Sequence, residues 1–386
     1  MTADTHKDLA IVLFIIIMVG LFGNIMNLKV LANKEIRKVS TFRFLLYLSI
    51  IDIMVLIICA IDSVLTYGFN IEVRQMSSLI CKIHTFFTYF LTHMSSIVLM
   101  CVSIERLSVV CSSVNHSFLR SSRNSTFKSN RIEKILLIIT VILVFFNIHY
   151  LFFFDLTSFK ENPNNQNNDF NFDYKYKYLN SSLKRQIKDF IINKKLAIAD
   201  KFYNEFTLNY KYVNEEDDDI DLNQYTVCYS FGNEIYDFFM THIWIWIDST
   251  IYSFVPIFVM IVCSFTILFK IRSKRNNFLK LTFSTNRKII ENRINRNKQI
   301  LYMLTATNIY FIICSLPYCI LCLKLNFTDN NFKFTQTLFL VHILSYSNNS
   351  FNFVFYGLFS KQYRQSAMEL LFPKTKNNNI NNRIKL

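Results

Sequence analysis

Long apolar runs separated by shorter polar stretches dominate the sequence. Seven such runs stand out, at residues 9–32, 44–67, 79–110, 135–155, 240–269, 300–323 and 335–358. Each reaches the roughly 20 helical residues that a bilayer core of about 30 Å requires. The runs are much longer than β-strands, and none shows the strict alternation of a membrane barrel. They therefore predict an all-α membrane protein with a seven-transmembrane helix bundle.

The first run differs from a cleaved signal peptide. Its flank Met1–Asp8 is not basic, its apolar stretch is too long, and no small-residue cleavage site closes it. We therefore predict that residues 1–8 are an N-terminal segment before a true span, and that residues 9–358 form the seven-helix domain.

Charge is segregated along the chain, and this decides the orientation. The net charge is +15, a value often seen in nucleic-acid-binding proteins, yet 52% of the residues are hydrophobic. The loops 33–43, 112–134 and 270–298 and the tail 359–386 hold 25 Lys and Arg against four acidic residues. The loop 156–239 holds ten basic and fourteen acidic residues. Positive residues stay in the cytosol, so the sequence predicts an extracellular N-terminus, a cytoplasmic tail and no nucleic-acid partner.

The long outer loop 156–239 has an unusual composition. An Asn-rich stretch covers 162–171 and an acidic run covers 215–221, and low-complexity sequence of this kind predicts disorder. Residues 181–207 have the pattern of an amphipathic helix. Among the nine cysteines, Cys81 and Cys228 lie at outer ends of segments, in oxidising surroundings. A disulfide between them would join the loop to the third span.

Short motifs recur in successive segments of the chain. In chain order they are Gly23–Asn27, Leu48–Asp52, Cys81 with Glu105–Leu107, Pro256, Phe311–Pro317, Asn352–Tyr356 and Gly357–Arg364. The first resembles G-N-x-x-V, the second L-A-x-x-D, the third D/E-R-Y after a cysteine, the sixth F-x-x-C-W-x-P and the seventh N-P-x-x-Y, with a proline in the fifth segment and a short amphipathic helix after the seventh. In this order and spacing the motifs resemble those of the rhodopsin-like family of G-protein-coupled receptors.

The resemblance implies roles for these residues. Asp52 is an ionisable group inside an apolar helix, which is costly unless it is paired or hydrated. It either bonds to Asn24 as a structural partner or, by resemblance, lines a hydrated pocket able to hold sodium. The pocket residues are Asn24, Asp52, Ser95, Asn348 and Asn352.

The cytosolic side carries the implied switch. By resemblance, Arg106 pairs with Glu105 at rest and is released when the helices part, which opens a cleft for a heterotrimeric G protein. The alternative is a pair of side chains that reach to the membrane interface. Phe311 and Pro317 would move with the sixth helix, and Asn352 and Tyr356 belong to the seventh-helix motif.

Several positions depart from the family pattern. Ser315 stands at the aromatic position of the sixth segment, Phe353 at the proline of the seventh, Ser264 at a tyrosine of the fifth and Asn27 at a valine of the first. These changes leave the fold expectation intact and put the detailed activation route in question.

The ligand is the least determined feature. Thr88 stands where amine receptors of the family carry Asp, and the seventh segment lacks the Lys that a retinal protein needs. The acidic outer loop and the outer carboxylates Asp62 and Asp248 favour a basic, aromatic-rich extracellular peptide. Local pairing of both carboxylates is the alternative. The candidate contact residues are Asp62, Thr88, Tyr89, Trp244, Asp248 and Tyr318.

Other functions have less support in the sequence. A chemosensory receptor for a small molecule is one alternative, and a transporter is another, although no internal repeat is visible. No enzymatic motif appears, the histidines lack metal-ligand spacing, and no cofactor beyond a sodium ion is expected. Asn180 and Asn326 are predicted glycosylation sites in outer loops. The expected location is the plasma membrane.

Overall fold

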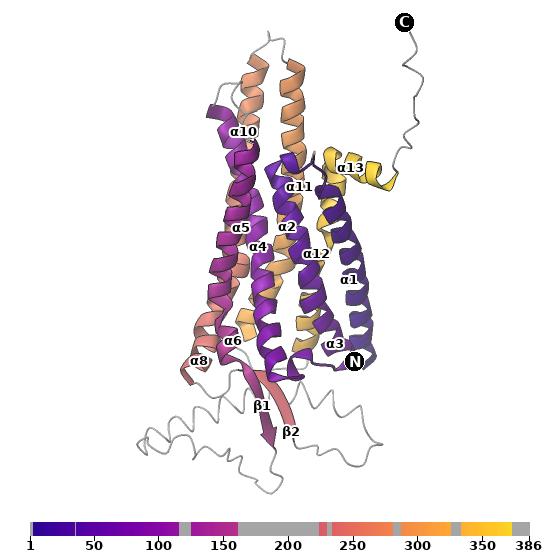
Figure 1. Cartoon of the computed structure of the whole chain (residues 1–386), viewed down its shortest axis with the longest axis vertical. Coiled ribbons are helices and arrows are strands. Elements are labelled where there is room, and N and C mark those ends of the chain that lie inside the picture. Colours follow the sequence, from indigo (N-terminus) through magenta and orange to yellow (C-terminus); the bar gives the residue numbers. More distant parts are fainter. Residues whose placement is uncertain are drawn as a thin grey trace.

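A computed structural model describes residues 3–34, 36–115, 125–160, 224–229, 234–280, 287–325 and 333–372. Counting adjoining helical pieces as one helix, the described residues form a bundle of seven long helices (Figure 1). In chain order these are α1 (Ala3–Leu31), α2 (Ser40–Val55) with η2 (Leu56–Ala60) and α3 (Ile61–Phe69), α4 (Ser78–Asn115), α5 (Ser125–Asn147) with α6 (His149–Phe153), α8 (Glu234–Phe238) with η5 (Phe239–Trp244), α9 (Ile245–Ser249), η6 (Thr250–Phe254) and α10 (Val255–Lys280), α11 (Arg287–Leu325), and α12 (Lys333–Phe359).

Six of these helices within the described residues are long and apolar enough to cross a membrane. The chain is thus a multi-pass membrane protein in its composition and architecture. The seventh predicted segment is helical, as α12, but does not belong to these six. The reason lies in its sequence, because Asn348, Asn349, Asn352 and several serines lower its hydropathy.

The burial pattern is the reverse of that in a water-soluble bundle. Phe145, Phe258 and Phe269 on the outer surface are 79%, 69% and 75% exposed. Asn24 and Asp52, by contrast, are completely buried. Apolar side chains outside and polar side chains inside are what a hydrocarbon solvent selects, because buried polar groups can then satisfy one another.

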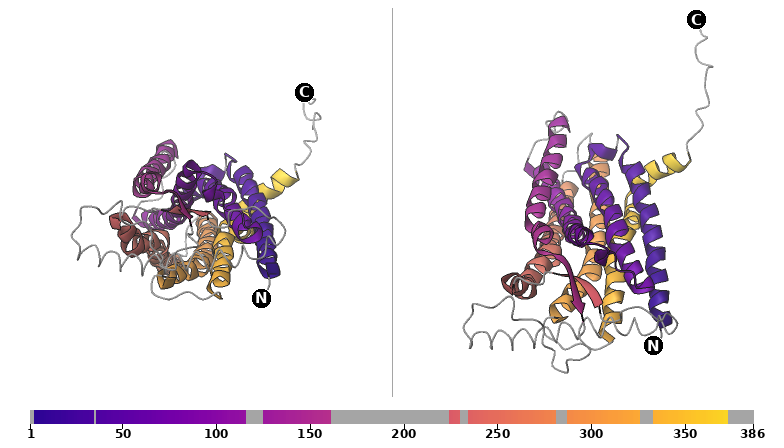
Figure 2. Two further views of the ribbon diagram at one scale, coloured as in Figure 1. Left: turned by 90° about the horizontal axis from the view of Figure 1, so that it is seen from below. Right: turned by 60° about the horizontal axis from the view of Figure 1, so that its bottom comes forward.

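The two ends of the bundle are built differently (Figures 1 and 2). One end carries an antiparallel pair of strands, β1 (Asp155–Lys160) and β2 (Gln224–Tyr229), in which Leu156 faces Cys228. At the other end α13 (Lys361–Leu371) lies across the bundle, beyond the end of α12. Ser360 caps α13 by accepting a 3.2 Å hydrogen bond from the backbone N–H of Tyr363. This short helix is the one predicted after the seventh segment.

Local irregularities of the helices were only partly predictable. Pro256 and Pro317 lie within helices, as expected, and α10 and α11 extend the fifth and sixth helices well beyond their predicted spans. The π-helical turns η2, η5 and η6 were not expected. The turn η6 ends just before Pro256, whose missing N–H leaves a backbone carbonyl of the preceding turn without its usual partner.

Glycines allow α1 and α12 to pack closely. A Cβ atom built on Gly23 would lie 2.0 Å from Cδ1 of Phe353, and one built on Gly20 would lie 2.4 Å from Oγ of Ser350. Phe353 is the residue that stands in place of the family's proline. Its ring therefore occupies space that exists only because residue 23 lacks a side chain.

Candidate functional site

A buried carboxylate lies at the centre of the polar core. Asp52 Oδ1 accepts hydrogen bonds from Ser95 Oγ at 3.0 Å and from Asn349 Nδ2 at 2.7 Å, and Oδ2 accepts one from Asn352 Nδ2 at 2.8 Å. These donors come from α4 and α12, so one side chain of α2 holds three helices together. Three hydrogen bonds offset much of the cost of burying a carboxylate.

The Asn-rich turn of α12 uses a residue that the sequence did not single out. Asn349 rather than Asn348 contacts Asp52. Asn24 does not bond to Asp52; its Nδ2 donates to the backbone oxygens of Gly20 and Asn349, at 3.0 and 2.8 Å. Asn24 therefore fixes the backbone of the turn that presents Asn349. The signal for Asn349 was its polarity inside an apolar helix.

A small cavity of about 10 Å³ lies beside this cluster. That is room for roughly one water molecule or a small ion. The buried Oδ1 of Asn348 has no hydrogen-bond partner among the described residues. The cavity is lined by Thr92, Ser95, Ser96, Tyr252, Phe311, Ser345, Tyr346, Asn348 and Asn349.

The cluster fits a sodium ion poorly. Sodium requires oxygen ligands with free lone pairs, as other hard cations do. Both oxygens of Asp52 already accept hydrogen bonds. Oδ1 accepts one from the amide nitrogen of Asn349, and Oδ2 accepts one from the amide nitrogen of Asn352. Asp52 also does not line the neighbouring cavity. The charge of Asp52 is thus offset by protein donors, and we derive no role for sodium.

A hydrogen-bond chain connects this cluster to α13. Tyr363 Oη donates to Asn27 Oδ1 at 2.7 Å, and Asn27 Nδ2 donates to Asn24 Oδ1 at 3.5 Å. Burial raises the pKa of the Tyr363 hydroxyl to about 12, so it stays a donor. The departure at Asn27 is thereby explained: the amide gives the buried tyrosine of α13 its acceptor.

The predicted switch residues Glu105 and Arg106 lie in the C-terminal part of α4. Arg106 is 7% exposed, and the neighbouring Glu105 accepts a hydrogen bond from Ser40 Oγ at the start of α2. Phe311 and Tyr356 are buried in the main core cluster. This hydrogen bond connects the side chain of Glu105 to α2.

Asn308 joins three helices near this region. Its Nδ2 donates to Ser103 Oγ of α4 at 3.1 Å and to Ser264 Oγ of α10 at 3.3 Å. Ser264 stands where the family has a tyrosine. Asn308 belongs to none of the sequence motifs, so it was not among the predicted site residues.

Near the opposite end, Asp62 is paired within the chain. Its Oδ2 lies 3.2 Å from Arg74 Nη2, and its Oδ1 lies 3.9 Å from His84 Nε2. The side chain of Asp62 is 8% exposed. Arg74 belongs to η3 (Val73–Gln75), which follows α3. Thr88, one turn beyond His84, donates to the His84 carbonyl oxygen at 2.8 Å and so stays bonded within its own helix.

The other predicted contact residues form two groups. The ring of Tyr89 stacks on that of Tyr150 with centroids 4.5 Å apart, and Tyr318 lies 6.1 Å from Tyr252. Trp244 is buried against His149, beneath the strand pair. Asp248 lies 3.0 Å from His93, a fully buried residue of α4.

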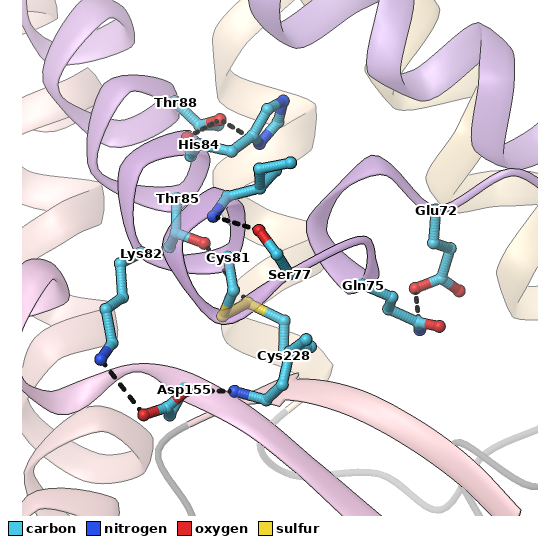
Figure 3. The surroundings of a disulfide bond; sticks show 12 residues. Glu72, Gln75, Ser77, Cys81, Lys82, His84, Thr85, Thr88, Asp155 and Cys228 are labelled. Carbon is cyan, nitrogen blue, oxygen red and sulfur yellow. Dashed lines mark hydrogen bonds and ion pairs between the residues drawn. A yellow bond between two sulfur atoms is a disulfide. The ribbon is translucent and has the colours of Figure 1, made fainter.

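Cys81 and Cys228 form a disulfide, with Cα atoms 5.6 Å apart (Figure 3). It ties β2 to the N-terminal end of α4. Lys82 Nζ lies 3.1 Å from Asp155 Oδ2, a second link between α4 and the strands. Hydrogen bonds from Ser78, from the backbone N–H of Leu156 and from Lys82 lower the pKa of Asp155.

The disulfide predicts a labelling pattern. In unreduced protein in detergent, neither Cys81 nor Cys228 should react with a thiol reagent, while the partly exposed free thiol of Cys111 serves as the positive control. After reduction both should react, as measured by mass spectrometry of proteolytic peptides. Labelling of both cysteines before reduction would contradict the bond.

The predicted glycosylation sites and the predicted loop helix remain predictions. Asn180 and Asn326 lie outside the described residues, as does the expected helix at 181–207. Within the described residues, no three His, Cys, Asp or Glu side chains gather closely enough to hold a metal ion. No protein-family model matches the sequence, and no curated protein matches it.

Proposed function

We propose that the chain is a divergent rhodopsin-like G-protein-coupled receptor. It crosses the plasma membrane seven times, with α12 as the seventh span, an extracellular N-terminus and a cytoplasmic tail. It binds an extracellular ligand, a neuropeptide in our proposal, and activates a heterotrimeric G protein when the sixth helix moves outward. It is not an enzyme.

The observation that carries the proposal is the cluster around Asp52. Motif residues that are far apart in the sequence, Asp52, Ser95 and Asn352, meet at one carboxylate, and Asn24 orients the same turn of α12. A seventh span that is polar on its inner face would be costly alone in lipid. Its polar groups become tolerable in a bundle that supplies partners for them, so the composition of α12 is compatible with a span.

The proposed activation has a physical basis in the described contacts. An outward movement of α11 would break the hydrogen bonds of Asn308 to Ser103 and Ser264. These are neutral side-chain hydrogen bonds, each with a net value of about 1 kcal/mol. A ligand with a modest preference for the open state can therefore shift such an equilibrium.

The test is a peptide-library screen on cells that express the chain, with second messengers as the readout. A peptide that signals through the wild type should bind Arg106→Ala but produce no response, because the arginine would contact the G protein rather than the ligand. Surface expression and peptide binding are measured in parallel, and Lys29→Ala is the matched control on the same side of the membrane.

The result that would overturn the proposal is equally specific. Solute uptake into sealed vesicles containing the purified chain, with no second-messenger response to any peptide or small molecule, would indicate a transporter. Full signalling by Arg106→Ala would remove this residue from the coupling step.

A further inference from the structure

The buried imidazole of His93 connects three helices in the half of the bundle nearer to the strand pair. Its Nε2 lies 3.0 Å from Asp248 Oδ1 on α9, and its Nδ1 lies 3.3 Å from Asn147 Nδ2 on α5. His93 and Asn147 are completely buried. Asn147, His93 and Asp248 therefore form a continuous series of hydrogen-bond contacts, and this geometry indicates which ring nitrogen of His93 carries the proton.

The amide of Asn147 fixes the tautomer of His93. Asn147 Nδ2 donates to the Leu143 carbonyl oxygen at 2.8 Å, which identifies this atom as the nitrogen. Its other N–H faces Nδ1 of His93, so Nδ1 is an acceptor and carries no proton. The single ring proton is then on Nε2, which donates to Asp248 Oδ1. His93 is neutral in this arrangement, and Asp248 keeps its full negative charge.

The second oxygen of Asp248 is left available. Among the described residues no hydrogen bond reaches Asp248 Oδ2, and the side chain is 18% exposed. Aromatic rings lie beside the imidazole that contacts Asp248. The ring centroid of Tyr89 lies 6.4 Å from that of His93, and the ring of Tyr89 stacks on that of Tyr150. A carboxylate near aromatic rings is an arrangement that suits an ammonium or guanidinium group.

Asp62, the other outer carboxylate, does not have this property. Its charge is already met by Arg74, whose Nη2 lies 3.2 Å from Oδ2. A ligand cation at Asp62 would have to displace an intramolecular guanidinium held at high effective concentration. The two carboxylates are therefore not equivalent, although the sequence treats them alike.

We propose that Asp248 is the single anchor for a cationic group of the ligand, an ammonium or a guanidinium. The ring of Tyr89, which lies 6.4 Å from that of His93, contributes to binding, and His93 holds the carboxylate in position. Asp62 takes no part in ligand recognition. This inference rests on the proposed receptor function, because it assigns the ligand class of the same bundle.

The experiment uses matched charged and neutral probes on the purified full-length chain. N-acetyl-Arg-Phe-amide is compared with N-acetyl-citrulline-Phe-amide, and phenethylamine with phenethyl alcohol. Binding is read as the shift of thermal unfolding, which a thiol-reactive dye reports through buried free cysteines such as Cys59 and Cys319. Both cationic probes should raise the unfolding midpoint at millimolar concentration, and the neutral probes should not. Comparing the peptide pair with the amine pair shows whether the site binds a guanidinium group, an ammonium group or both.

Variants then locate the anchor. Asp248→Asn should weaken the cationic probes by about tenfold or more, because a partly desolvated charge pair is lost. Asp62→Asn should change their binding by less than about twofold. Asp248→Glu keeps the charge and should retain most of the shift, which separates loss of the anchor from loss of folding.

The outcomes separate this inference from the receptor function. Equal shifts from charged and neutral probes, no shift from any cationic probe, or undiminished binding to Asp248→Asn would overturn the anchor. A peptide that signals with full potency through Asp248→Asn would also overturn it while supporting the receptor. Cationic binding that depends on Asp248, together with solute uptake and no second-messenger response to any peptide or small molecule, would support the anchor and contradict the receptor.

Discussion

Gly23→Ala is expected to destabilise the bundle by about 1–3 kcal/mol. The added methyl group would lie 2.0 Å from the ring of Phe353, so α1 and α12 would have to move apart or the ring would have to leave its position. The lowered stability should appear as a lower thermal unfolding midpoint of purified protein and as reduced surface expression.

The control for this variant is Gly357→Ala, later in α12. A Cβ atom at Gly357 meets nothing within 4 Å, so this substitution should be neutral or slightly stabilising. Phe353→Ala should rescue part of the loss in Gly23→Ala, giving a coupling energy between the two positions. Equal midpoints for Gly23→Ala and the wild type would show that the two helices are not packed this closely.

Asn349→Leu is the second substitution with a large expected effect. It removes the 2.7 Å hydrogen bond to Asp52 Oδ1 and a 3.1 Å bond to Ser95 Oγ. Asp52 would then be buried with fewer donors, and a hydrogen bond to a charged group is worth about 1.5–3 kcal/mol. The unfolding midpoint should fall by several degrees.

The neighbouring residue provides a matched control of the same type. The side-chain oxygen of Asn348 is buried without a hydrogen bond among the described residues. Asn348→Leu should therefore cost little, or even stabilise the protein, because it removes an unsatisfied polar group. If Asn348→Leu proved the more damaging of the two, the assignment of Asn349 to Asp52 would be rejected.

The helical membrane architecture was predictable from the sequence. Runs such as 9–32 and 135–155 are long and apolar, and hydrocarbon admits few other structures of that length. Helices follow in the structure at all seven predicted segments, six of them apolar enough to span a membrane. The pair Cys81 and Cys228 was also predictable, because only these two of the nine cysteines lay at predicted outer ends of segments.

The candidate sites were predictable only in part. The sequence identified Asp52, Ser95 and Asn352, and these side chains do meet. It placed Asn348 in the cluster where the structure has Asn349, because consecutive helical residues point about 100° apart and the rotation of α12 was unknown. It did not select Asn308 or Asn147, which belong to none of the motifs and whose hydrogen bonds to other helices are visible only in the folded bundle.

Composition and hydropathy thus determined that the chain has long helical spans, which loops carry the positive charge and which polar residues lie within apolar segments. Each of these properties depends on the sequence of a single segment, so it can be predicted without knowing how the segments pack together. Only the tertiary structure decided that Arg74 pairs with Asp62 while His93 contacts Asp248, and that Gly23 makes room for Phe353. Such facts depend on how helices are rotated and spaced against one another, and packing in three dimensions sets both quantities.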